Sequence, residues 1–234
     1  MNLCVPVPDG VRPAHAAFST VGAIAMQGVR QAEPALGETA VVIGLGLIGQ
    51  LVVRLLAASG VRVFGIDTVE ERCRLAEKAG AIVCAGPDPA GVDRVERALL
   101  DTTGAIGADH VFLAAGGSSN GPVETAARLA RDRGRIVDIG KCSLDLPWNA
   151  YYEKELDVRF SRSYGPGRYD PAYEEQGRDY PLAFVRWTER RNFEAVLDMM
   201  AAGRLDLGPL VSHRFAVEEA GAAYDLLASR EPSL

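Results

Sequence analysis

Three glycines have the spacing that is needed to hold the phosphates of a dinucleotide. Residues 40–50 read Ala-Val-Val-Ile-Gly-Leu-Gly-Leu-Ile-Gly-Gln, so a GxGxxG turn of Gly44, Gly46 and Gly49 directly follows a short β-branched run. Gly44 permits a tight turn and Gly46 lets a pyrophosphate approach the backbone. Gly49 lets the next helix pack closely on the sheet. The pattern predicts a dinucleotide-binding site.

The residues around this turn have chemistry that suits the same ligand. A helix that starts at Leu47 and Ile48 presents unpaired N–H groups and a positive dipole end to phosphates. Asp67 ends a second apolar run, 18 residues after Gly49, close to the position of the acid that binds the ribose hydroxyls. A carboxylate there repels a 2′-phosphate, so NAD is favoured over NADP. Arg72 lies beside the adenine and ribose or faces solvent.

Two other interpretations of the glycine pattern stay open. A Gly-rich turn occurs in α/β proteins that bind no dinucleotide. A methyltransferase also combines a Gly-rich first turn with an acid after the second strand, although its glycines usually read GxGxG. The third glycine of this chain stands at the dinucleotide spacing.

Composition limits the classes of function. The chain has 234 residues, of which 48% are hydrophobic, and this is enough to build a large core. Its net charge of −6 argues against binding to nucleic acid or to anionic membranes, and no apolar stretch approaches 18 residues. The first residues lack the pattern of a signal peptide, and the four cysteines form no CxxC. We therefore expect a cytoplasmic protein.

Strand and helix patterns alternate through the middle of the chain. This alternation predicts a Rossmann-type α/β fold with a doubly wound, six-stranded parallel sheet. Strands are expected at 40–43, 61–66, 81–84, 110–114, 135–139 and, at an edge, 156–163. Helices are expected at 46–59, 69–79, 90–102, 120–132, 188–202 and 217–229.

The same patterns divide the chain into three parts. Residues 1–36 form a lead-in segment with a buried helix, and residues 37–163 form the NAD-binding domain. Residues 164–234 form a loop rich in Tyr, Gly and Pro, followed by C-terminal helices that pack on that domain. A long irregular loop of this kind is usually functional or mobile.

Several stretches resemble the cofactor-binding part of the medium-chain dehydrogenase/reductase family, the zinc-type alcohol dehydrogenases. The matching stretches are 37–49, 65–81 and 133–140. Residues 151–156, 161–170 and 185–192 further resemble a bi-domain subgroup, in which such a half precedes a half of the glucose–fructose oxidoreductase type. Members of the family carry an N-terminal barrel-like catalytic domain, and this sequence resembles only the part that follows it. We therefore expect a piece of such an enzyme.

The resemblance implies NAD-dependent hydride transfer on an alcohol, ketone or sugar-linked carbonyl as the small-molecule substrate. The nicotinamide half is then expected over the strand ends at Ala115 and Gly116 and at Ile139 and Gly140. The catalytic residues are unknown. Weak candidates for proton transfer are Lys141, Lys154 and Tyr164, and for each of them a solvated or packed side chain is the ordinary alternative.

No metal is expected. The resemblance places the third zinc ligand of the zinc-dependent members near Thr20, and threonine is not a zinc ligand. His15, His110 and His213 are too far apart in the sequence to form a pair with metal-ligand spacing.

A homodimer through the edge strand 156–163 is expected, because an open edge exposes unpaired N–H and C=O groups. A second class of function also stays open, in which the chain is a non-catalytic module that binds NAD or only dimerises.

Overall fold

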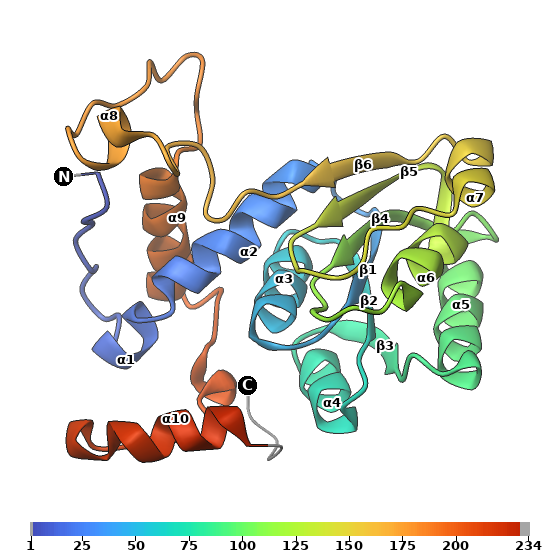
Figure 1. The fold of residues 1–234 in the computed structure, drawn as a ribbon, viewed down its shortest axis with the longest axis horizontal. Coiled ribbons are helices and arrows are strands. Elements are labelled where there is room, and N and C mark those ends of the chain that lie inside the picture. Colours follow the sequence, from blue (N-terminus) through green and yellow to red (C-terminus); the bar gives the residue numbers. More distant parts are fainter. Residues whose placement is uncertain (1, 230–234) are drawn as a thin grey trace.

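A six-stranded parallel sheet forms the centre of the molecule (Figure 1). The computed structural model describes residues 2–229. The strands are β1 Thr39–Ile43, β2 Arg62–Ile66, β3 Ala81–Ala85, β4 Ala108–Leu113, β5 Ala130–Asp138 and β6 Asp157–Phe160, in the order β3-β2-β1-β4-β5-β6. Every pair of neighbouring strands is parallel. This is the predicted Rossmann-type arrangement, in which the strand order reverses beside β1.

The helices that connect the strands cover both faces of the sheet (Figure 1). They are α3 Leu47–Ala58, α4 Glu70–Lys78, α5 Pro89–Thr103, α6 Gly121–Leu129 and α7 Trp148–Glu153. One core contains Val42 of β1 with side chains of α3 and α4, and the other contains Val41 with side chains of α5 and α6. The two cores follow from the period of two in a strand, because successive side chains point to opposite faces.

Residues before β1 complete one of these cores. The N-terminal helices are α1 Pro13–Ala16 and α2 Ser19–Ala32. Small residues let α2 lie close to its neighbours: a Cβ added at Gly28 would come within 2.2 Å of Ile139, and one at Gly22 within 2.7 Å of Val196. The buried helix expected in the lead-in segment is therefore α2.

The segment after β6 forms a separate group of elements on the α2 side of the sheet. It contains α8 Pro171–Glu174, α9 Glu189–Ala201, the short 3-10 turns η1 Gly208–Leu210 and η2 Val217–Glu219, and α10 Ala220–Ala228. Helix α9 packs against α2, whereas no residue of α10 is buried. Figure 1 shows α10 set apart from the sheet.

No helix within residues 2–229 has both the length and the apolar character that a membrane crossing requires.

Candidate functional site

The glycine-rich turn connects β1 to α3 at the carboxyl edge of the sheet. Gly44 has a φ of +92°, and a Cβ added there would lie 2.5 Å from the backbone nitrogen of Ala115. A Cβ on Gly49 would lie 1.9 Å from the carbonyl oxygen of Gly44. A Cβ on Gly46 would meet no atom within 4 Å. Two glycines are therefore required by the packing of the turn, and the third faces open space that a ligand can fill.

Helix α3 begins at this open side of the turn. Leu47 and Ile48 are its first residues, and Gly46 is the preceding cap residue with an extended backbone. The N–H groups of the first helical turn have no intrahelical acceptor, and the helix dipole adds a partial positive charge. The arrangement suits an anion such as a pyrophosphate.

Asp67 lies at the end of β2, next to the glycine-rich turn. Its side chain is almost fully buried, and its Oδ2 accepts a hydrogen bond of 2.6 Å from the N–H of Leu45. Its Oδ1 accepts from the N–H of Val69 at 2.8 Å, and the guanidinium of Arg72 lies 3.9 Å away. The carboxylate is therefore fixed against the backbone of two turns, the glycine-rich turn and the turn that follows β2. This is the position predicted for the ribose-binding acid.

The ends of β4 and β5 form the third part of this edge. Pairing continues past the strands: the N–H of Lys141 donates to the carbonyl of Ala115 at 3.2 Å, and Gly116 is bridged to Lys141. The N–H groups of Ile139 and Gly140 both donate to the carbonyl of Leu113. The four residues predicted to lie under the nicotinamide are thus brought together at one edge.

The three candidates for proton transfer do not converge on this edge. Lys141 is there and is exposed. The ammonium of Lys154 donates instead to three backbone carbonyls, those of Ala127, Arg128 and Ala130, at the C-terminal end of α6. A cation at this position donates to carbonyls that have no intrahelical partner, and it is attracted by the negative end of the helix dipole. These three hydrogen bonds occupy the Lys154 ammonium away from the cofactor edge, and its catalytic role stays an untested candidate.

Tyr164 packs against α9. Its ring lies 5.3 Å from that of Phe193, and its carbonyl accepts from the side-chain amide of Asn192. Burial raises the pKa of the Tyr164 hydroxyl above its ordinary value. These contacts give the tyrosine a packing role.

Sequence reasoning missed a buried polar pair on α3. Gln50 and Arg54 are the polar residues in an otherwise apolar helix and stand one turn apart, so their side chains meet. The guanidinium of Arg54 donates to Oε1 of Gln50 at 2.9 Å. Two polar residues four positions apart in an apolar helix are the sequence signal that could have predicted this contact.

A second missed feature is a pocket of about 360 Å³ beside the first residue of α3. Leu47 lines it together with Phe18 and with the segment 210–215, which includes His213 and Arg214. A larger hollow of about 810 Å³ lies elsewhere, around Trp148 and Lys154. The smaller pocket borders the glycine-rich turn, so it is the one that bears on the site.

The donor set within residues 2–229 does not fit a zinc ion. No three side chains of His, Cys, Asp or Glu in that part of the chain lie close enough together to hold a metal. His110 contacts Glu38 at 2.7 Å, and His213 lies beside Ser212. The expectation of a metal-free protein stays a prediction.

The fold and the geometry of this edge define a dinucleotide-binding Rossmann domain. The profile of the family described as zinc-binding dehydrogenase matches residues 48–176, and the chain belongs to that family. It corresponds to the cofactor-binding part, as predicted.

Known relatives agree with this classification. The chain is 29% identical over 211 residues to D-guloside 3-dehydrogenase of Escherichia coli K12, covering 88% of this chain and 55% of that protein. It is 29% identical over 227 residues to erythritol/L-threitol dehydrogenase of Mycolicibacterium smegmatis, covering 94% of this chain and 54% of that protein. The chain thus spans about half the length of the curated relatives it matches.

A solved structure has the same fold. An alcohol dehydrogenase of Escherichia coli CFT073, complexed with NADH, superimposes with a TM-score of 0.75 at 21% identity. The match covers 97% of this chain and 59% of that one.

Proposed function

We propose that this chain binds NAD(H) and forms the cofactor half of a dehydrogenase. The observation that carries the proposal is the joint geometry of Gly46, the start of α3 and Asp67: open space, anion-binding N–H groups and a fixed carboxylate lie along one sheet edge. A bound nicotinamide cofactor supplies hydride transfer. Relatives named for a guloside and for erythritol or L-threitol support an alcohol, a ketone or a sugar-linked carbonyl as the substrate.

Titration of the purified chain with NADH, followed by calorimetry, tests this proposal. We expect saturable binding at one site per chain that is competed by ADP, and weaker binding of NADPH because of Asp67. A folded chain that binds neither nucleotide would refute it.

A second candidate function is a non-catalytic NAD-binding or dimerisation module. It is favoured by the contacts of the Lys154 ammonium with the end of α6 and by the packing of Tyr164, which leave Lys141 as the one predicted proton-transfer candidate at the cofactor edge. A turnover assay with NAD and simple alcohols or polyols distinguishes the two. For this chain by itself we expect little turnover, because it spans about half the length of its dehydrogenase relatives and hydride transfer needs the substrate held close to the nicotinamide.

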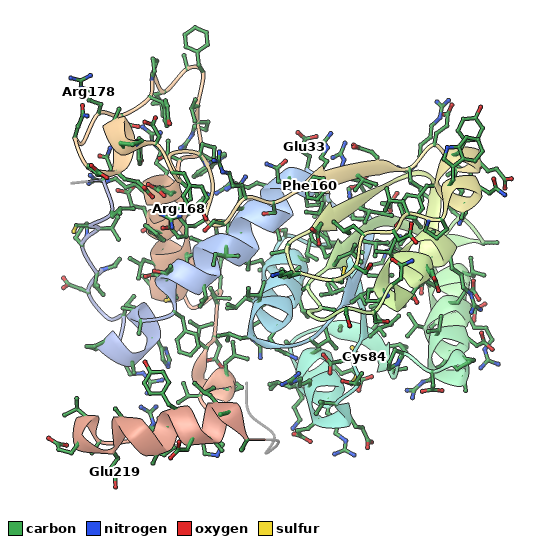
Figure 2. All side chains as sticks on the ribbon, viewed as in Figure 1. Glu33, Cys84, Phe160, Arg168, Arg178 and Glu219 are labelled. Carbon is green, nitrogen blue, oxygen red and sulfur yellow. The ribbon has the colours of Figure 1, made fainter. Side chains whose placement is uncertain are left out.

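The homodimer is also part of the proposal. β6 is an edge strand, and Phe160 on it is 65% exposed (Figure 2). The N–H of Ser161 donates to the carbonyl of Asp138, so by alternation the N–H groups of Val158 and Phe160 point outward. Pairing with a second copy would give these groups acceptors.

Two finer assignments complete the proposal. The stretches 151–156, 161–170 and 185–192 support membership in the bi-domain subgroup, and the sequence of the complete gene product tests it.

All four cysteines are free, two of them buried, which supports a reducing cytoplasm. Imaging of the tagged full-length protein in its host tests that location.

A further inference from the structure

Gln50 is completely buried in the first turn of α3, although it carries a polar amide. Both the amide nitrogen and the amide oxygen of Gln50 are hydrogen-bonded. Its Nε2 donates to the carbonyl of Leu45 at 3.1 Å and to the carbonyl of Arg72 at 2.8 Å, and its Oε1 accepts from Arg54 at 2.9 Å. Two donors and an acceptor on one planar group are found only in the side chains of Asn and Gln. The environment therefore specifies an amide.

The two carbonyls that Gln50 holds belong to the glycine-rich turn and to the first turn of α4, which follows the turn after β2. Leu45 is in the glycine-rich turn, and its N–H donates to Asp67. Asp67 accepts in turn from the N–H of Val69, and the N–H of Arg72 donates to the carbonyl of Val69 at 3.0 Å. Gln50 closes this series into a continuous ring of hydrogen bonds through both turns.

Arg54 also holds the side-chain amide of Gln50 in place. It is also buried, and its guanidinium donates to the backbone carbonyl of Gln50 and to the carbonyl of Asp206 as well as to the Gln50 side chain. The amide plane therefore cannot rotate without breaking three contacts. The ring is held rigidly on the side of the core.

We propose that Gln50 is a positioning residue for cofactor selection. It acts through Leu45 and Arg72: by fixing the separation of the two turns, it aims the Asp67 carboxylate at the ribose hydroxyls. This inference rests on the proposed function. Without the ring, the carboxylate can withdraw from the ribose and the nearby Arg72 guanidinium can contact a 2′-phosphate. Discrimination against NADPH then weakens.

The test compares the dissociation constants of NADH and NADPH for the unmodified chain and for Gln50→Met. Methionine fills a similar volume but cannot donate a hydrogen bond to the carbonyls of Leu45 and Arg72. Gln50→Glu is a second variant in case the first fails to fold. A carboxylate keeps the contact with Arg54 and cannot donate to either carbonyl. For both variants we expect NADH affinity to fall about ten-fold and the NADH-to-NADPH affinity ratio to narrow several-fold.

Asn192→Leu is the matched control. Asn192 is another fully buried amide, on α9, which accepts from Arg30 and donates to the carbonyl of Tyr164. Its loss removes buried hydrogen bonds away from the two turns. We expect a reduced melting temperature and an unchanged NADH-to-NADPH ratio.

The possible results separate the two proposals. If the unmodified chain binds neither nucleotide, the proposed function fails. If it prefers NADH and both Gln50 variants keep the same ratio, Gln50 only stabilises the fold and the inference is overturned. A ratio that narrows in the Gln50 variants but not in Asn192→Leu supports it.

Discussion

Asp67 is the residue on which we expect cofactor choice to depend most directly. Substitution by alanine removes the acceptor for the ribose hydroxyls and the charge that repels a 2′-phosphate. We expect Asp67→Ala to bind NADH about ten-fold or more weakly and to narrow the preference over NADPH, as measured by calorimetry. The change also leaves the N–H groups of Leu45 and Val69 without an acceptor, so we expect a loss of stability of about 1–3 kcal/mol. Equal affinities for NADH and NADPH in the unmodified chain would contradict this role.

Glu189 is a buried carboxyl whose ionisation should make stability depend on pH. It is the first residue of α9, and neither of its carboxylate oxygens has a hydrogen-bond partner within residues 2–229. Burial, and next the charge of Glu174, raise its pKa to about 7, although the positive charge of Arg168 opposes them. Figure 2 shows Arg168 between β6 and α8, near α9.

The direction of the pH effect follows from this raised pKa. Between pH 4.5, the ordinary pKa, and about pH 7 the folded chain keeps the proton that the unfolded chain has lost, so stability falls as pH rises. We expect Glu189→Gln to lack this decrease and to become the more stable protein above pH 7, by an amount of the order of 1–2 kcal/mol. Urea unfolding at pH 5 and pH 8 measures how the free energy of unfolding of each protein changes with pH. An equal change in the two proteins would contradict the role assigned to Glu189.

Residues differ in how far their roles could be predicted from the sequence. The packing roles of Gly44 and Gly49 were predictable because they follow from spacing within one strand-turn-helix unit, and the place of Asp67 after β2 followed from its distance from Gly49. Lys154 was not, because its partners are carbonyls at the end of α6 that only the tertiary fold brings near. The ring closed by Gln50 likewise joins two turns that are apart in the sequence.

At the scale of elements, the strands and long helices followed the hydrophobic period, and their predicted bounds agree with the observed ones within a few residues. Helix α7 was missed because six residues give too short a pattern to show a helical period. Strand β5 extends further back, to Ala130, because it continues to pair with β4 past an irregularity in the register.

The edge strand β6 supports a prediction about assembly. Proline at position 158 would remove an outward N–H donor and fix φ, and prolines are tolerated at sheet edges. We expect Val158→Pro to keep the fold and to convert a dimer to a monomer in sedimentation velocity. Substitution of Arg159, whose N–H faces β5, should instead destabilise the chain, because its guanidinium donates to the carbonyl of Gln31 and contacts Glu33 and Asp157. A dimer that persists with proline at position 158 would exclude this edge as the interface.

Across the whole molecule, the stability against local unfolding should differ from helix to helix. Helix α10 contains no buried residue, and Tyr224 and Leu227 on it are 73% and 65% exposed. Helix α3, by contrast, is buried along most of its length. Hydrogen exchange should therefore be fast in α10 and slow in α3. Equal protection of the two helices would mean that another surface covers α10.

In the proposed complex, NADH binds across the carboxyl edge of the sheet, over the glycine-rich turn. Nuclear magnetic resonance of the labelled chain, titrated with NADH, tests this position residue by residue. We predict that the largest changes in amide chemical shift occur at Gly44–Gly49, at Asp67 and at the strand ends near Gly116 and Gly140. Changes concentrated instead around Trp148 and Lys154, where the larger hollow lies, would contradict this binding position.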